Sequence, residues 1–270
     1  MSRSRAPDPS GDSERLLIAG DTHGNLDWIR TLCKLAARHG CCGVVQLGDF
    51  GFWPDQYELR SNDRLVINDR WLNAVAGTAE LHKIWWRVID GNHDAHQLAR
   101  DAFPAGGNGV RPIRDGVLDW ADRGAVWTWC GVRFGALGGA VSIDKEWRTD
   151  GLSWWATEEI TDLEVDALFD RARPAGIDVL FTHDDPSLPD GISPLSNPLI
   201  RAACDRSLQQ VARAVDELAP KLLLHGHYHK RYSGLYGHTR IEGLASDEQS
   251  SRQGEPWCIL ELPSLAVVSR

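Results

Sequence analysis

Residues 16–24 read Leu-Leu-Ile-Ala-Gly-Asp-Thr-His-Gly, an apolar run that ends in a glycine, a carboxylate and an imidazole. A short apolar run that stops at glycine is typical of a buried β-strand. The next segment has apolar residues at helical spacing, namely Leu26, Ile29, Cys33 and Ala36. The stretch therefore predicts a strand over 16–19, an amphipathic helix after it, and polar groups between the two.

The same arrangement recurs along the first half of the chain. A second apolar run over 44–47 stops at Gly48, and a third over 84–89 stops at Asp90. The first half therefore predicts the order β-α-β-α-β, which is typical of a sheet with parallel strands.

The second half mixes hairpins with helices. Runs over 126–130 and 132–137, joined near Gly131, predict a hairpin, and Thr161 with Glu164 three residues later is a capping box that begins a helix. Further strands and one further helix are predicted at 179–181, from Asn197-Pro198 onward, at 222–224, near Tyr232, near Ile241 and at 258–262.

These elements predict an α/β fold in which two mixed β-sheets pack face to face and helices cover the outer faces, an α-β-β-α sandwich. No linker separates the two halves, so we expect one domain over 15–270. Residues 1–14 are polar and rich in Pro, Ser and Arg, and we expect a disordered tail there.

Composition narrows the class of protein. Hydrophobic residues make up 42% and charged residues 25% of the chain, as in ordinary globular proteins. No apolar run reaches the roughly 20 residues of a membrane span, and the polar start lacks a secretory signal. The six cysteines form no C-x-x-C pair, which favours free thiols in a reducing compartment. We therefore expect a cytoplasmic protein with no membrane partner.

The charge balance bears on nucleic acid. Acidic residues outnumber basic residues 38 to 29, a formal net charge of −9. Sequence-independent binding to a nucleic-acid backbone needs clustered Lys and Arg, so there is no strong nucleic-acid signal. A local basic patch is still compatible with this total.

Polar residues gather where the predicted strands end. Carboxyl ends of parallel strands meet at one edge of a sheet, so these groups should converge. The residues are Asp21 and His23, then Asp49, then Asn92, His93 and Asp94, then His183, and last His227 and His229. Carboxylates mixed with imidazoles favour Mn, Fe or Zn over Ca, which prefers oxygen ligands alone.

Spacing indicates how these residues could share ions. Asp21 and His23 lie two apart, so on an extended backbone they point the same way and can bind one ion. His227 and His229 have the same spacing. Asp49 follows a strand between them and could bridge two ions about 3.5–4 Å apart.

The ordered set resembles the motifs of calcineurin-like metallophosphoesterases. The motifs are Gly20-Asp21-Thr22-His23-Gly24, Gly48-Asp49, Gly91-Asn92-His93-Asp94, the isolated His183, and Gly226-His227-Tyr228-His229. Each motif alone could be an ordinary turn, because glycine and aspartate are common there. Five elements in the family order, spanning residues 20–229, favour the resemblance over that alternative.

The resemblance implies two divalent metal ions, Mn before Fe or Zn. It implies one ion on Asp21, His23, Asp49 and His229, and a second on Asp49, Asn92, His183 and His227. It also implies that His93 is a catalytic histidine beside the scissile ester rather than a ligand. Asp94 is predicted to orient His93. His225, in a second H-x-H pattern, is predicted to support the site rather than bind metal.

Four further residues are candidates for substrate contact. Phe52 and Trp53 follow the predicted bridge, and aromatic rings beside a phosphate site can stack on a base. Lys145 and Arg148 follow a glycine-rich turn and could bind phosphate oxygens. The alternatives are core packing for the aromatic rings and solvated surface charges for the cations.

We expect a metal-dependent hydrolase of a phosphomonoester or phosphodiester, acting through metal-activated water on a small, nucleotide-type substrate. The continuation of Gly48-Asp49 into Phe50-Gly51 departs from the D-R-G element of protein phosphatases, which disfavours phosphoprotein. The alternatives are a non-catalytic metal-binding scaffold on the same fold, and a protein phosphatase or nuclease of the same superfamily. The sequence leaves the substrate, the metal pair and the oligomeric state open.

Overall fold

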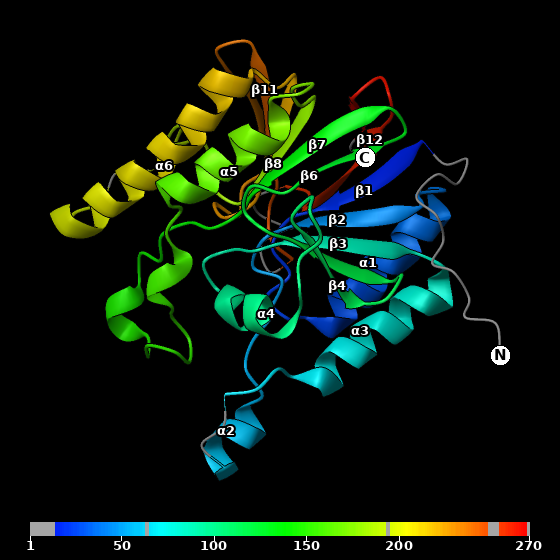
Figure 1. The fold of residues 1–270 in the computed structure, drawn as a ribbon, viewed down its shortest axis with the longest axis vertical. Coiled ribbons are helices and arrows are strands. Elements are labelled where there is room, and N and C mark those ends of the chain that lie inside the picture. Colours follow the sequence, from blue (N-terminus) through cyan, green and yellow to red (C-terminus); the bar gives the residue numbers. More distant parts are fainter. Residues whose placement is uncertain (1–13, 63–64, 193–194, 248–253, 269–270) are drawn as a thin grey trace.

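The structure is a computed structural model that describes residues 14–62, 65–192, 195–247 and 254–268 (Figure 1). Of the predicted tail over 1–14, only Glu14 falls within the described residues. Two layers of strands lie between two layers of helices, which is the predicted α-β-β-α sandwich.

The first sheet has seven strands in the order β13-β12-β1-β2-β3-β5-β4. Neighbours β1, β2, β3 and β5 are parallel, whereas β12, β13 and β4 join antiparallel, so the sheet is mixed. The strands are β1 Arg15–Ala19, β2 Gly43–Leu47, β3 Trp85–Ile89, β4 Val110–Arg114, β5 Leu118–Ala121, β12 Trp257–Glu261 and β13 Ala266–Val268.

The second sheet has six strands in the order β10-β11-β9-β8-β7-β6. Its centre, β7, β8, β9 and β11, is parallel, and the hairpin strands β6 and β10 join antiparallel at the two edges. The strands are β6 Val126–Trp129, β7 Val132–Leu137, β8 Val179–Thr182, β9 Leu222–His225, β10 Tyr232–Tyr236 and β11 Thr239–Gly243.

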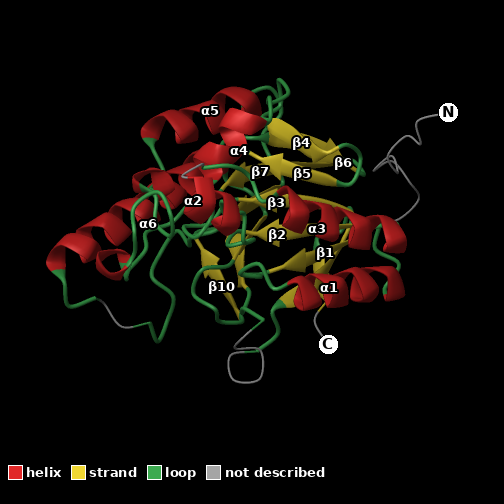
Figure 2. Ribbon diagram, turned by 90° about the horizontal axis from the view of Figure 1, so that it is seen from below, coloured by secondary structure: helices red, strands yellow, loops and turns green. Residues whose placement is uncertain are grey.

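Helices cover the outer face of each sheet (Figure 2). Helix α1 (Leu26–Arg38) packs on β1 and β2, and α3 (Asp69–His82) packs on β3 and on α1. Helix α5 (Asp162–Ala172) packs on β6 and β7 and against α6 (Pro198–Leu218). The shorter elements are α2 Gln56–Asn62, α4 His96–Ala102, and the 3₁₀ turns η1 Lys145–Trp147 and η2 Ala156–Glu158. No helix in the described ranges combines the length and the apolar character needed to cross a bilayer.

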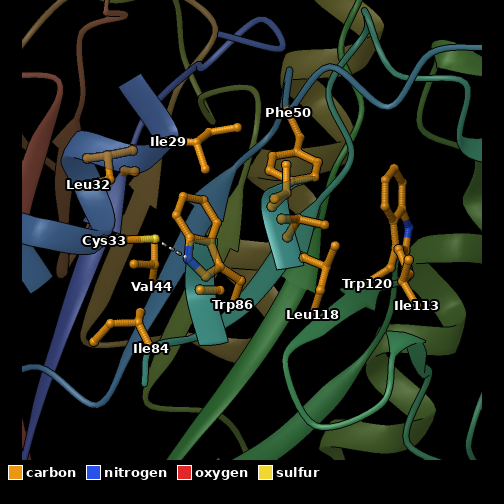
Figure 3. Packing of buried hydrophobic residues seen from close by; sticks show 14 of the residues in the cluster. Ile29, Leu32, Cys33, Val44, Phe50, Ile84, Trp86, Ile113, Leu118 and Trp120 are labelled. Carbon is orange, nitrogen blue, oxygen red and sulfur yellow. Dashed lines mark hydrogen bonds between the residues drawn. The ribbon is translucent and has the colours of Figure 1, made fainter. Parts of the chain in front are cut away.

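Alternation along the strands builds three layers of core. In β1, Leu17 and Ala19 face the α1 side, whereas Leu16 and Ile18 face the other sheet. The helix-side core contains Trp86, whose indole Nε1 lies 3.3 Å from the Cys33 sulfur (Figure 3). Because the strands are buried on both faces, their ends are held rigidly where the polar loops begin.

Several elements were not among the sequence predictions. Strand β4 contains Arg111, Pro112 and Arg114, and only two of its five residues are buried, so it shows no continuous apolar run. Strand β13 has just three residues. Both lie at sheet edges, where one neighbouring strand suffices and a polar sequence is tolerated.

Candidate metal centre

The carboxyl ends of five strands from both sheets deliver the predicted ligands to one place. Asp21 follows β1, Asp49 follows β2, and Asn92 follows β3 of the first sheet. From the second sheet, His183 follows β8, and His227 and His229 follow β9. Facing sheets thus supply carboxylates from one side and imidazoles from both.

One group of side chains is Asp21, His23 and His229, whose ligand atoms lie within 4.8 Å of one another. Asp21 Oδ2 is 2.9 Å from His229 Nε2, and the His23 and His229 rings meet edge to face at 5.1 Å. Asp21 is fully buried, whereas the histidines are partly exposed, so the group opens toward solvent.

Asp49 lies between this group and a second. Its Oδ2 is 3.4 Å from His23 Nε2, and its Oδ1 is 3.4 Å from His183 Nε2. The two oxygens of one carboxylate therefore face two different imidazoles, as the predicted bridge requires.

The second group is deeper. His183 is fully buried, and its Nε2 lies 3.1 Å from Asn92 Oδ1. The His227 ring is 5.1 Å from the His183 ring, but among the described residues no three-residue cluster that could hold a metal ion includes His227. The structure thus brings Asp49, Asn92 and His183 together and leaves His227 beside them.

The donor set fits divalent transition ions. With ligand bonds of about 2.1 Å, two ligand atoms on one cation are separated by roughly 3.0–3.4 Å. The separations of Asp49 from His23 and His183 are 3.4 Å, and His183 to Asn92 is 3.1 Å. Imidazole and carboxylate ligands together suit Mn, Fe or Zn.

Backbone strain is concentrated at these residues. Four of the predicted ligands have a positive φ, which is unusual for residues other than glycine. They are His23 at 41°, Asp49 at 55°, His227 at 66° and His229 at 52°. Such conformations are costly for residues with a Cβ and occur where function requires the side-chain direction. The strain is consistent with a site that holds ligands in place before an ion binds.

Two motif glycines allow the carboxylates to approach closely. A Cβ on Gly91 would lie 2.1 Å from Asp49 Oδ1, and a Cβ on Gly226 would lie 2.1 Å from Asp21 Oδ1. Any side chain at either position would displace a predicted ligand, so these glycines belong to the site.

The buried carboxylates and imidazoles of the centre strongly shift one another's pKa values. Burial alone would raise the pKa of Asp49, but the nearby His183 and His93 hold it well below its usual value. Burial would likewise lower the pKa of His183, yet Asp49 and Asp21 raise it to about 10. The pKa of His23, opposed by burial, is raised to about 9 mainly by Asp49. Without metal, protons on imidazoles balance the carboxylates.

His93 lies at the rim of the centre beside Arg148. Arg148 Nη1 is 3.0 Å from His93 Nδ1, and Nη2 is 2.6 Å from His93 Nε2. Asp144 holds the guanidinium through an ion pair of 2.8 Å, and Trp53 donates its indole N–H to the His93 carbonyl at 2.8 Å. Burial lowers the pKa of His93, and Arg148 lowers it further against the pull of Asp49.

Asp94 occupies a different place from the one predicted. Its carboxylate accepts backbone N–H groups, and its partners are Phe50, Gly51, Phe52 and Gly91. The group that touches the His93 ring is Arg148 instead. Asp94 therefore fixes the loop after Asp49, and any effect on His93 passes through the backbone.

The residues predicted to contact substrate differ in whether their side chains are accessible. Phe52 is only 2% exposed and packs against Trp120 in the core, which corrects its assignment as a substrate contact. Trp53 is 38% exposed and stays available. Lys145 has its ammonium 5.9 Å from the Trp154 ring centroid, on the same segment as Arg148.

Supporting residues were mostly missed from the sequence. Ser142 and Glu158 contact Asn92 as a chain, although they carry no motif and lie in the long connection between β7 and α5. His225, predicted to support the site, is fully buried and bonded to the Tyr232 hydroxyl at 2.6 Å. The one sequence signal for such buried supporting residues was that His225 and Tyr228 lie beside the ligand histidines in the chain.

A cavity of about 620 Å³ lies elsewhere. Its lining includes Trp85, the first residue of β3, and Trp129, the last residue of β6, and none of the predicted ligands. Because the ligands follow the other end of β3, the cavity and the metal centre are at opposite ends of the strands. The cavity is therefore separate from the metal centre.

Comparison with known proteins identifies the family of the chain. A sequence model of the family described as calcineurin-like phosphoesterase matches residues 14–231. The chain belongs to this family. The family is dimetal-dependent, and this member has the candidate ligand groups described above.

Solved structures share the fold at low sequence identity. The protein TT1561 of Thermus thermophilus is 14% identical with a TM-score of 0.57, covering 95% of this chain and 97% of its own. A dimetal phosphatase from Danio rerio is 14% identical with a TM-score of 0.54, covering 94% and 93%. No curated protein sequence matches this chain.

Proposed function

We propose that this protein hydrolyses a small phosphate ester, a monoester or diester of nucleotide type, with two divalent metal ions. The observation that carries the proposal is the position of Asp49, whose two carboxylate oxygens each lie 3.4 Å from the imidazole of a different ligand group. The family membership supports the proposal, and a dimetal phosphatase shares the fold.

We assign one ion to Asp21, His23, Asp49 and His229, and the other to Asp49, Asn92, His183 and His227, with manganese as the first choice. When bound, such ions activate a water as nucleophile and neutralise the phosphoryl oxygens. For His227, which lies beside the second group, a small rotation of its ring toward His183 is part of the proposal.

The residues of the rim supply charge and hydrogen bonds to the ester. His93, whose pKa is lowered by burial and further by Arg148, is the catalytic histidine beside the leaving oxygen. The fixed positive charge comes from Arg148, which is 11% exposed and held by Asp144. Arg148 thus has the phosphate-binding role, whereas the ammonium of Lys145, on the same segment, lies over the Trp154 ring.

The exposed indole of Trp53 at the rim favours a ring-bearing leaving group. Trp147, next to Arg148 in the chain, is 88% exposed, and Trp53, bonded to the His93 carbonyl, is 38% exposed. Exposed indoles beside a phosphate site can stack on a base. This supports a nucleotide-type substrate over a simple alkyl phosphate.

The compartment follows from the cysteines. Cys33, Cys41, Cys204 and Cys258 are free, and burial raises the pKa of Cys33 to about 11 and of Cys41 to about 12. Protonated, buried thiols are unreactive, and free thiols are typical of a reducing compartment. We propose the cytoplasm.

The test is a panel of metals against phosphate esters. Protein loaded with Mn, Fe or Zn is assayed on mono-, di-, cyclic-nucleotide and oligonucleotide esters and on bis-p-nitrophenyl phosphate. We expect turnover with manganese, and roughly 100-fold or greater loss in Asp49→Asn together with reduced metal content. Asp27→Asn, an exposed aspartate on α1, is the control.

The rival function is a non-catalytic metal-binding scaffold. It predicts full metal loading and correct folding but no turnover of any ester with any metal in the panel. His93→Ala separates the two further, because a catalytic His93 is needed for turnover and not for metal content. Wild-type turnover by His93→Ala would remove the role assigned to that residue.

A further inference from the structure

A buried chain of hydrogen bonds connects Asn92 to two residues of the β7–α5 connection. Asn92 Nδ2 donates to Ser142 Oγ at 3.0 Å, and Ser142 Oγ donates to Glu158 Oε2 at 2.5 Å. The Ser142 backbone N–H donates to the other oxygen, Glu158 Oε1, at 2.9 Å. Ser142 and Glu158 are each only 1% exposed, so water does not compete for these bonds.

The chain has a direction, and the carboxylate sets it. Both oxygens of Glu158 accept from Ser142, Oε1 from its backbone N–H and Oε2 from its hydroxyl, so the Ser142 hydroxyl proton is committed to Glu158. The serine then offers a lone pair to Asn92, and only the NH₂ of the amide can face it. The Asn92 carbonyl oxygen must therefore point the other way, to where its Oδ1 lies 3.1 Å from His183 Nε2.

A second set of contacts fixes Glu158 to the strand that carries Asn92. The fully buried Arg123 forms an ion pair of 2.6 Å with Asp90, which lies two residues before Asn92. The same guanidinium donates to the backbone carbonyls of Thr157, Glu158 and Glu159 at 2.9–3.1 Å. The acceptor end of the chain is thus held at a set distance from the end of β3.

We infer that Ser142 and Glu158 are positioning residues that fix the Asn92 amide with its oxygen toward the second metal ion. This inference rests on the proposed function for the assignment of Asn92 as a ligand. An amide offers one oxygen and one nitrogen that differ little in shape, so a rigid site must specify which one faces the cation. The structural alternative is that the chain only ties the long connection to the sheet.

The experiment measures the two ion affinities separately. Full-length protein and its variants are dialysed against a series of buffered free Mn²⁺ concentrations, and bound manganese is counted by mass spectrometry. Ser142→Ala and Glu158→Gln are expected to weaken one of the two ions by about 10–100-fold and to leave the other unchanged. Thr239→Val removes another buried hydroxyl, which donates to Pro220 at 2.7 Å far from the site, and should change neither affinity.

A double variant separates positioning from tethering. In Asn92→Asp both terminal atoms are oxygens, so orientation no longer matters, and adding Ser142→Ala should cause no further loss of Mn²⁺ affinity. If Ser142→Ala weakens both ions equally, or costs the same in the Asn92→Asp background, the chain is a tether and the inference is overturned. Unchanged affinities in Ser142→Ala and Glu158→Gln also overturn it.

The ligand assignment is tested in the same series by Asn92→Ala. Loss of one ion in Asn92→Ala together with wild-type binding in Ser142→Ala would overturn the positioning role and leave the proposed function standing. Wild-type binding of two ions by Asn92→Ala would instead contradict the ligand assignment, and the inference would fall with it.

Discussion

Protons and metal ions compete for the imidazoles of His23 and His183. The carboxylates of Asp49 and Asp21 outweigh burial and raise the pKa of His183 to about 10, and that of His23 to about 9. At pH 7.5 both rings are therefore protonated in the metal-free protein. A metal ligand must be a neutral imidazole, so binding has to release these protons.

We predict that loading two Mn²⁺ at pH 7.5 releases about two protons from these histidines. Affinity for the metal should consequently rise with pH until the metal-free pKa values are passed. Calorimetric titration in buffers that differ in ionisation enthalpy measures the number released. A binding enthalpy that is the same in all buffers would show that the two imidazoles were neutral beforehand.

Arg148 lies beside the His93 ring and affects its pKa. Arg148→Ala should lower kcat roughly 100-fold, because it removes a fixed donor beside the ester. The pKa of His93, held down by burial and by Arg148, should rise, and the acid limb of the pH–rate profile should move to higher pH. Arg148→Lys should recover part of the rate, whereas Arg173→Ala, 76% exposed on its side chain, should behave as wild type. An unshifted profile in Arg148→Ala would contradict the pairing.

Strands and helices were predictable wherever a local pattern was strong. The apolar runs over 16–19 and 44–47 became β1 and β2, and the Thr161–Glu164 capping box caps α5 as predicted. The edge strand β4 was not predictable, because its pairing with β5 depends on a neighbour rather than on its own sequence. Periodicity reports burial, and an edge element is buried little.

The capping box at the start of α5 should contribute to the stability of the protein. Thr161→Ala removes the side-chain acceptor for the Glu164 backbone N–H and should cost about 1 kcal/mol of unfolding free energy. Thr157→Ala, at an exposed position nearby, should cost little. Thermal denaturation followed by circular dichroism compares the two variants. Equal midpoints would show that the cap contributes no stability to α5.

The packing of the whole molecule explains why some site residues could be predicted from the sequence and others could not. The ligands follow buried strands, and two sheets packed face to face bring those strand ends to one rim. The groups around them come from elsewhere: Arg148, Ser142 and Glu158 lie in a connection without regular periodicity, and only three-dimensional packing sets them against His93 and Asn92. Phe52 misled for the same reason, because proximity in sequence to Asp49 did not show which way its ring points.

The organisation of the chain into one domain over 15–270 stays a prediction. A shared core between the sheets is its physical basis, since Leu16 and Ile18 of β1 lie in one cluster with Phe134 of β7 and Phe181 of β8.

In the proposed function, Asp49 joins two metal ions in one centre. Crystals of the protein grown with Mn²⁺ and measured at the manganese absorption edge would locate the ions by anomalous scattering. We predict two peaks about 3.5–4 Å apart, one on each side of the Asp49 carboxylate. A single peak, or two peaks that do not share Asp49, would contradict the bridging role of Asp49.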